Sequence, residues 1–429
     1  MMKKTMLVLS ALLYTVMVFA QQSRIDIKAN PLFSASSYYA YPGPQQKQLT
    51  PAPAGYKPFY ISHYGRHGSR WLINKNDYIQ PVSVLQRADS LGKLTALGRD
   101  VLRRLTLIRD ASKNRYGELT QLGGEQHRQI AKRMIQNFPE VFAGKTNIDA
   151  RSTTVIRCIL SMENALQQLL IVNPELQIKQ DASNHDMYYM NYDDPVLSKN
   201  KMPAKAEAAY KTFGKKYLHY DSVLNRLFND SSYWKHQVNY DLLYRRLFSN
   251  ASNVQSTELR HNLSLYDIYN EQEIYDNWRT ENAWWYIAYG GSPLNGGTQP
   301  FTQRNLLRNI IAQADSCLQL EHPGATLRYG HDTVIMPLTC LLDLDGLGMQ
   351  VENLEELETR GWYSYRIFPM ASNIQFVFYR KSAADKDVIF KVLRNENEAT
   401  LPIKTDIAPY YHWKDFKAYF LKKLDSYKE

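Results

Sequence analysis

The sequence predicts an α/β protein, with a central mixed sheet flanked by helices and an inserted, mostly helical cap. One observation is a set of short strand-like runs, at 57–62, 325–329, 363–367, 374–379 and 388–393. A second is a set of longer segments with apolar residues at helical spacing, at 94–108, 126–138, 159–171 and 306–318. The third is the stretch 183–300, which is rich in Tyr, Trp, Asn and charged residues and has helical spacing at 233–247. Strands and helices that alternate in this way indicate helices packed around a sheet.

The chain begins with the pattern of a secretory signal peptide. Lys3 and Lys4 precede the apolar run 6–19, and Ala20 precedes two glutamines. The run is shorter than the ~20 residues that span a bilayer, and no other stretch is long and apolar enough for a membrane span. We therefore expect residues 1–20 to be removed and the mature protein to be periplasmic or extracellular.

The remaining chain divides by composition. Residues 21–50 are rich in Gln, Ser, Pro and Tyr and predict an extended N-terminal arm. Residues 51–182 and 301–429 contain the predicted strands and form the α/β domain, and 183–300 form the cap. A cap over a site excludes water and shapes substrate choice. Its aromatic residues could line a wall for a sugar or inositol ring, although packing between helices is their commoner use.

The first candidate for chemistry follows the strand at 57–62. There Arg66-His67-Gly68-Ser69-Arg70 places one imidazole between two guanidinium groups. The planar donor fork of arginine matches phosphate oxygens, and nearby positive charge disfavours protonation of His67, which leaves a nucleophilic ring nitrogen. The motif therefore predicts a phosphate site, and the alternative for such a short motif is a basic surface turn.

The second candidate follows the predicted strand at 325–329, where Gly330-His331-Asp332-Thr333 leads into an apolar segment. Loops at the carboxyl ends of strands carry the chemistry of many α/β enzymes, and a helix N-terminus favours anions. His331 could bind a phosphate oxygen while Asp332 transfers a proton. The alternative is that Asp332 caps a helix and His331 is an ordinary turn residue. His63 and His127 are expected to be structural.

Together these motifs resemble the histidine acid phosphatases, the two-domain branch of the histidine phosphatase superfamily that includes phytases and multiple inositol polyphosphate phosphatases. Segments 117–126, 151–161 and 369–379 resemble further parts of the family pattern, and 369–379 resembles the inositol polyphosphate branch in particular. The resemblance implies that Arg157 is a third arginine of the pocket, with Arg151 as the alternative. Many members of that branch have His-Ala-Glu where this chain has His331-Asp332-Thr333, so the reaction class is better defined than the substrate.

The resemblance implies a covalent mechanism without cofactor or metal. Arg66, Arg70, Arg157 and His331 would bind the phosphoryl oxygens, His67 would form a phosphohistidine, and Asp332 would donate and then accept a proton. An ordinary aspartate titrates near ~3.9, so Asp332 needs an acidic medium or a pKa raised by burial and nearby carboxylates. We therefore expect a pH optimum below neutrality.

Charge and cysteine content limit the alternatives. The net charge is +10, which favours polyanionic partners, but the chain has no long basic run or recognition motif for nucleic acid. A polyphosphorylated small molecule suits the charge better, unless the charge is spread over solvated faces. Cys158, Cys317 and Cys340 lack zinc-site spacing, and buried free thiols are favoured over a disulfide.

Three functions fit these observations. The first is a secreted phosphatase that prefers inositol phosphates such as phytate. The second is the same fold acting on a small sugar phosphate or a nucleotide. The third is a protein that binds phosphate esters without turnover, for which a proton donor such as Asp332 would have no use.

Overall fold

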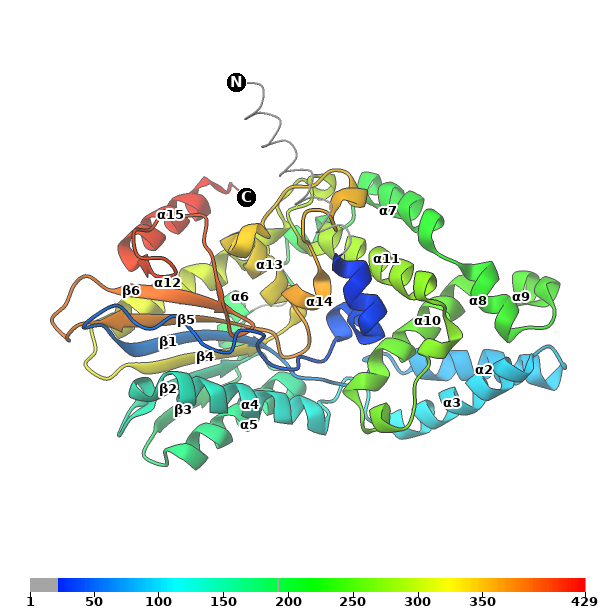
Figure 1. Ribbon diagram of the computed structural model, residues 1–429, viewed down its shortest axis with the longest axis horizontal. Helices are drawn as coiled ribbons and strands as arrows, with labels where there is room; N and C mark the ends of the chain where they lie inside the picture. Colours follow the sequence, from blue (N-terminus) through cyan, green and yellow to red (C-terminus); the bar gives the residue numbers. More distant parts are fainter. Residues whose placement is uncertain (1–21, 191–192, 429) are drawn as a thin grey trace, which may run out of the picture.

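The computed structural model describes residues 22–190 and 193–428, so the predicted signal peptide at 1–20 lies outside the described residues. The described chain forms a lobe built on a sheet and a lobe made of helices, side by side along the long axis (Figure 1). No described helix has both the length and the apolar character needed to cross a bilayer.

The first lobe is built on a mixed sheet, as the sequence predicts. Its strands are β1 (Lys57–Arg66), β2 (Asn147–Ser152), β3 (Gln177–Asp181), β4 (Gly324–Gly330), β5 (Asn373–Arg380), β6 (Ile389–Arg394), β7 (Asn397–Ala399) and β8 (Tyr411–His412). Strand order in the described sheet is β3-β2-β4-β1-β5-β6-β7, with β8 paired to β6. The pairs among β1 to β4 are parallel, whereas β5 runs antiparallel to β1 and to β6.

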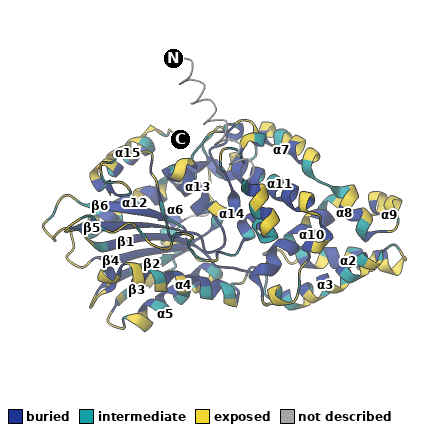
Figure 2. Ribbon diagram, in the orientation of Figure 1, coloured by how far each residue is buried: buried dark blue, intermediate teal, exposed yellow. Residues whose placement is uncertain are grey.

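Helices cover both faces of this sheet. α4 (Gln121–Asn137) and α5 (Ile156–Val172) lie on one face, and α12 (Arg304–Leu318), α13 (Asp332–Leu342) and α15 (Trp413–Ser426) lie on the other (Figure 1). The central strands are buried between these layers (Figure 2). β4 is buried along its whole length, as the sequence predicts for 325–329, and its burial includes the side chain of Arg328.

The second lobe contains more of the chain than the predicted cap at 183–300. Its helices are α2 (Asn76–Ser90), α3 (Ala96–Ser112), α7 (Ala204–Tyr217), α8 (Tyr220–Leu227), α9 (Ser231–Gln237), α10 (Tyr240–Asn253) and α11 (Glu271–Tyr289). Helices α2 and α3, which come before the predicted cap, share one hydrophobic core with α8, α10 and α11. The predicted boundaries therefore leave out two helices, because amphipathic periodicity does not show which neighbour a helix packs against.

The expectation of a strand at 363–367 is wrong, whereas the helical expectation at 233–247 is confirmed except for a break at 238–239. Residues 363–367 contain the short helix α14 (Ser364–Ile367) in place of a strand. The Ser364 amide donates to Asn282 Oδ1 of α11 at 2.9 Å, so this segment bonds to a helix and not to a sheet edge. Residues 233–247 contain the end of α9 and the start of α10, because Asn239 accepts a hydrogen bond from the Leu242 amide and begins a new helix there.

The N-terminal arm is also not extended as expected. Residues 22–29 are helical, and η1 (Pro31–Tyr38) is a 3₁₀ segment with Ser34–Ser37 buried. The arm's contacts are with residues far along the chain: the Arg24 guanidinium lies over the Tyr275 ring, and Tyr365 donates a hydrogen bond to Asp26. Docking of this kind leaves no periodic signal in the sequence.

Candidate active site

Two parallel strands bring the two predicted motifs together. β1 pairs with β4 so that Arg66 lies opposite Gly330, and both strands end at the same edge of the sheet. The His67 amide donates to the Gly330 carbonyl at 2.8 Å, and the rings of His67 and His331 lie 5.8 Å apart, edge to face. Residues far apart in the chain are thus neighbours because of one strand pairing.

The loop after His67 is held by side chains from the two helices on one face of the sheet. The Gly68 amide donates to Ser161 Oγ at 3.1 Å, and the Ser69 amide donates to Gln126 Oε1 at 2.8 Å. The His67 loop and the start of α4 approach so closely that a Cβ on Gly68 would collide with the Gly123 backbone, and a Cβ on Gly123 with the Ser69 backbone. The segment 117–126 therefore fixes the position of the His67 loop.

His67 is buried and neutral. Its Nδ1 lies 2.9 Å from the Gly68 carbonyl oxygen. A carbonyl can only accept, so Nδ1 carries the ring hydrogen and the lone pair is on Nε2. Burial, and then the charges of Arg157, Arg66 and Arg70, hold the pKa of His67 well below its ordinary value. This is the state that a nucleophilic imidazole needs.

Arg66 is fully buried, and its guanidinium bonds to three oxygens of the protein. Nη1 donates to the carbonyls of Ser37 at 2.6 Å and Phe368 at 2.7 Å, and Nη2 donates to Asp332 Oδ2 at 2.6 Å. Burial lowers the pKa of Arg66 to about 10, which still leaves it charged at neutral pH. Arg66 therefore links the His67 loop to Asp332 and to the N-terminal arm.

The other predicted arginines differ in where they lie. Arg70 donates from Nη1 to the Trp71 carbonyl at 2.9 Å and is almost fully buried. Arg157 lies close enough to depress the pKa of both His67 and His331, and for each of them its effect comes next after that of burial. Arg151, the alternative, forms ion pairs with Asp149 at 3.0 Å and Asp186 at 3.5 Å, so it is not brought into the cluster.

His331 is a neutral ring whose orientation is set by neighbours. Its Nε2 lies 3.1 Å from Thr153 Oγ1 and 3.7 Å from Cys158 Sγ, and its amide donates to the Tyr64 hydroxyl at 3.2 Å. Burial and then Arg157 lower the pKa of His331 to about 3. Thr153 and Cys158 occur in the motif that supplies Arg157, but their contact with His331 follows from the pairing of β2 with β4.

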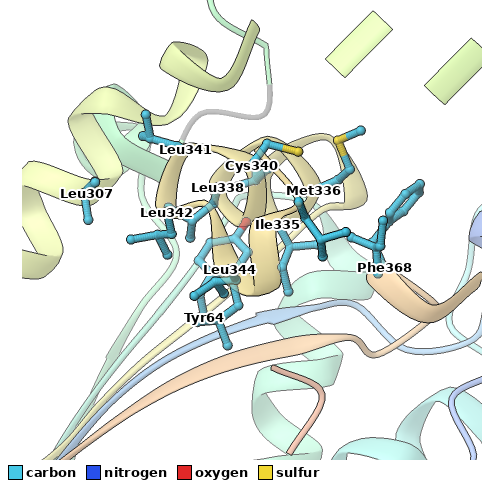
Figure 3. Packing of buried hydrophobic residues seen from close by; sticks show 14 of the residues in the cluster. Tyr64, Leu307, Ile335, Met336, Leu338, Cys340, Leu341, Leu342, Leu344 and Phe368 are labelled. Atoms are coloured by element: carbon cyan, nitrogen blue, oxygen red, sulfur yellow. The ribbon is translucent and has the colours of Figure 1, made fainter. Parts of the chain in front are cut away.

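Asp332 is the first residue of α13, and the rest of that helix holds it in place. α13 is buried from Val334 to Leu342, and its side chains pack around Tyr64 of β1 and Phe368 (Figure 3). The Thr333 amide donates to Asp332 Oδ1 at 2.9 Å while Arg66 occupies Oδ2. Because α13 is tightly packed, the Asp332 carboxylate at its first residue is held in one position.

The pKa of Asp332 is not raised in this structure. Burial raises it, but the charges of Arg66 and Arg70 outweigh burial and hold it below the ordinary value. Of the two alternatives for a working acid, a pKa raised by burial and nearby carboxylates therefore does not hold for the protein without substrate, because the charges facing Asp332 are cationic, and the acidic medium remains.

The N-terminal arm is a part of the site that the sequence did not predict. Besides the bond from Arg66 to the Ser37 carbonyl, the guanidinium of Arg70 lies over the ring of Tyr38, 5.3 Å from its centroid. Nothing in the composition of 21–50 marks these residues. His63 and His127, expected to be structural, are both buried, and the ring of each packs against the Tyr329 ring. The three cysteines are free thiols.

A model of the histidine phosphatase superfamily (branch 2) matches residues 66–395. The chain belongs to this family. Its motifs at 66–70 and 330–333 both fall within the matched region, which confirms the family resemblance seen in the sequence. A search of curated proteins gave no match.

Several solved structures share the fold of this chain. Multiple inositol polyphosphate phosphatase of Bifidobacterium longum, in complex with inositol hexasulfate, aligns with a TM-score of 0.74 at 18% identity, over 90% of this chain and 97% of that one. The phytase of D. castellii aligns with a TM-score of 0.63 at 13% identity, over 92% and 86%. The phytase of Hafnia alvei, in complex with tartrate, gives 0.53 at 14% identity, over 86% and 98%.

Proposed function

We propose that this protein is an exported histidine acid phosphatase that hydrolyses inositol polyphosphates such as phytate. The observation that carries the proposal is the state of His67. Its ring is neutral, its Nε2 carries a lone pair and no hydrogen, and the charges of Arg66, Arg70 and Arg157 lie nearby. A nucleophile in a cationic, buried pocket is suited to a phosphoryl group, whose charge is carried by its equatorial oxygens. The signal-peptide pattern at 1–20 supports export.

In the first step, the phosphoryl oxygens bind to the three arginines and His331. His67 Nε2 attacks phosphorus in line, the bond from phosphorus to the ester oxygen breaks, and the leaving alkoxide takes the proton of Asp332. In the second step, water attacks the phosphohistidine and gives its proton to the Asp332 carboxylate. The bond from phosphorus to nitrogen breaks, its electron pair returns to Nε2, and inorganic phosphate leaves.

In this scheme, substrate binding causes Asp332 to take up the proton that it later donates. Without substrate, Arg66 and Arg70 keep Asp332 ionised. A phosphoryl group that binds these arginines takes up their positive charge and adds negative charge beside Asp332. Both effects favour the neutral carboxylic acid. The optimum is therefore expected below neutrality, where the complex binds this proton most readily.

Inositol polyphosphates are preferred as the substrate class on two grounds. The described fold matches that of a phosphatase named for these esters, and the chain carries a net charge of +10 that suits a polyanion. Small sugar phosphates and nucleotides would be hydrolysed by the same chemistry. Kinetic measurements on each substrate distinguish them from inositol phosphates.

The test is phosphate release by the mature protein and by His67→Ala, between about pH 4 and 8 where carboxylates and imidazoles titrate. Phytate, glucose 1-phosphate and a nucleoside monophosphate serve as substrates. The proposal predicts His67-dependent release from phytate with the highest kcat/KM. Release from the small esters alone would reject the substrate class, and saturable binding with no release would show a binding protein.

A further inference from the structure

One peptide group in the candidate active site is bonded by three different parts of the chain. It is the peptide bond that joins Gly330 to His331, at the end of β4 and directly before α13. Its carbonyl accepts from the His67 amide at 2.8 Å and from Cys158 Sγ at 3.3 Å. Its N–H group donates to the Tyr64 hydroxyl at 3.2 Å. Both polar groups of this peptide are therefore bonded, by residues of β1, of α5 and of the loop after β1.

Tyr64 is fully buried, and its hydroxyl lies against the backbone of Gly330. Figure 3 shows its side chain pointing from β1 into the apolar cluster formed by α13. A Cβ on Gly330 would collide with the hydroxyl oxygen, so the tyrosine fits because residue 330 is glycine. Burial raises the pKa of Tyr64 well above its ordinary value, so the hydroxyl stays neutral. The ring packs in the core, and the hydroxyl is the part that reaches the His331 backbone.

Cys158 contacts the same peptide from α5. Its thiol donates to the Gly330 carbonyl and lies 3.7 Å from His331 Nε2. Burial raises the pKa of Cys158 to about 11, so the sulfur keeps the hydrogen that this donor needs. The preceding residue, Arg157, is the arginine whose charge lowers the pKa of His331. The start of α5 therefore brings both a cation and a hydrogen-bond donor to this part of the site.

The orientation of this peptide determines where the His331 ring lies. A peptide group is planar, so bonds that fix its carbonyl and its N–H also fix the direction in which the His331 Cα leaves it. Asp332 is anchored separately, by Arg66 and by the Thr333 amide. A tilt of the peptide would therefore displace His331 more than Asp332. A displacement of about 1 Å can cost about 10²-fold in rate.

We propose that Tyr64 and Cys158 are positioning residues, which hold the peptide between residues 330 and 331 so that the His331 ring faces the bound phosphoryl group. The proposal rests on the proposed phosphatase function and deepens it. Neither side chain transfers a proton or a phosphoryl group. Tyr64 acts through the His331 amide, and Cys158 acts through the Gly330 carbonyl. A buried N–H that loses its acceptor is costly, so removal of the Tyr64 hydroxyl should let the peptide leave this orientation.

The first test is a double-mutant cycle of Tyr64→Phe and His331→Ala. Tyr64→Phe keeps the ring and removes the hydroxyl. Two quantities are measured in the single and double variants: kcat/KM for para-nitrophenyl phosphate, and the Kd of inorganic phosphate by calorimetry. The matched control is Tyr60→Phe. Tyr60 lies on the same face of β1, is fully buried, and donates its hydroxyl to Thr326 Oγ1 at 2.8 Å.

Tyr64→Phe is expected to lower kcat/KM about tenfold, the equivalent of ~1.4 kcal/mol, and to raise the Kd of phosphate. In the His331→Ala background, the same substitution should change either quantity less than about twofold, because the ring that it positions is absent. Tyr60→Phe should stay within about twofold of the wild type. Equal losses from Tyr64→Phe in both backgrounds would indicate a merely structural role and overturn the proposal. A loss in Tyr60→Phe as large as in Tyr64→Phe would overturn it too.

The second test concerns the thiol. Cys158→Ala removes the donor and should lower kcat/KM about 2- to 10-fold, whereas Cys158→Ser keeps a donor and should recover most of that loss. Cys340→Ala, which removes a buried thiol of α13, is the matched control and should change kcat/KM less than about twofold. Equal impairment of the Ala and Ser variants would overturn the role of Cys158.

The remaining outcomes are also decisive. If Tyr64→Phe does not fold, the cycle of Cys158→Ala with His331→Ala decides alone. Failure of the wild type to release phosphate from any ester would instead reject the phosphatase function. The Kd values of phosphate would then still show whether Tyr64 acts on His331, so the two failures are distinct.

Discussion

Asp332 and Arg66 form a buried ion pair, with 2.6 Å between Arg66 Nη2 and Asp332 Oδ2. The pair joins the proposed proton donor on α13 to the loop that carries the proposed nucleophile, His67. It also explains why Asp332 has a depressed pKa in the protein without substrate. Substrate binding and protonation of the donor are therefore expected to be one coupled event, because both involve Arg66.

Asp332→Asn should slow the release of an alcohol far more than the release of an activated phenol. An alkoxide needs a proton as it leaves, and general acid catalysis contributes about 10²- to 10⁴-fold, whereas a nitrophenolate leaves without one. The measurement is kcat/KM for glycerol 1-phosphate and para-nitrophenyl phosphate in wild type and variant. Equal losses for the two leaving groups would rule out proton donation by Asp332.

Arg66→Met should destabilise the protein by about 3–5 kcal/mol, because it leaves the buried Asp332 carboxylate without its cation. The double variant Arg66→Met, Asp332→Asn should regain part of that loss, since the remaining group is uncharged. Denaturant unfolding measures both. Arg103→Ala serves as the control, because its ion pair with Asp100 is exposed at 65% and 44% and should cost no more than ~1 kcal/mol. If the Arg66→Met protein were as stable as this control, the structural role of Arg66 would be contradicted.

Acid should destabilise the fold between about pH 6.5 and 4. Burial lowers the pKa of His63 to about 3 and that of His127 to about 4. An unfolded histidine binds a proton below about 6.5, whereas these two stay neutral in the fold, so the unfolded state gains protons as pH falls and stability is lost. Each contributes up to ~1.4 kcal/mol per pH unit in that window.

His63→Leu should reduce this pH dependence by one proton. Unfolding free energies at several pH values give the slope for wild type and variant. The matched control is His322→Leu, because the side chain of His322 is 72% exposed and its removal should leave the slope unchanged. An unaltered slope in His63→Leu would mean that His63 is protonated equally in both states. Activity at low pH is therefore expected to be limited by stability as well as by chemistry.

Thr153→Val should lower kcat/KM by about 2- to 10-fold, the value of one hydrogen bond of ~0.5–1.5 kcal/mol. Thr153 Oγ1 lies 3.1 Å from His331 Nε2 and so fixes which ring nitrogen of His331 faces the phosphate. Thr153→Ser keeps the hydroxyl and should restore most of the activity. If Ser and Val were equally impaired, packing and not the hydrogen bond would be the cause.

The parts of the site that could be predicted from the sequence are those whose residues are adjacent in the chain. Each of the two motifs, 66–70 and 330–333, contains a candidate reactive group next to its neighbours in the chain. The pairing of β1 with β4 brings the two motifs together in the structure. The choice of Arg157 over Arg151 came from the family pattern, and the ion pairs of Arg151 agree with it.

The parts that sequence reasoning missed depend on tertiary contacts. Strands β2 and β3 are short, and β3 is largely exposed, so neither has a strong apolar pattern. Tyr38 reaches Arg70 through an arm whose conformation is set by Ser364 and Arg66, residues far away in the chain. The depressed pKa of Asp332 likewise follows from its pairing with Arg66, which no spacing in the sequence reveals.

The most direct test of the account is to trap the covalent intermediate. Mature protein is mixed with phytate, quenched in alkali after a few milliseconds, digested and examined by mass spectrometry, beside His67→Ala and Asp332→Asn. The account predicts one phosphoryl group on His67 in the wild type and none in the His67→Ala protein. In Asp332→Asn, para-nitrophenyl phosphate should give more trapped intermediate, because its hydrolysis lacks a base. Phosphate release without any phosphoryl group on His67 would contradict the account.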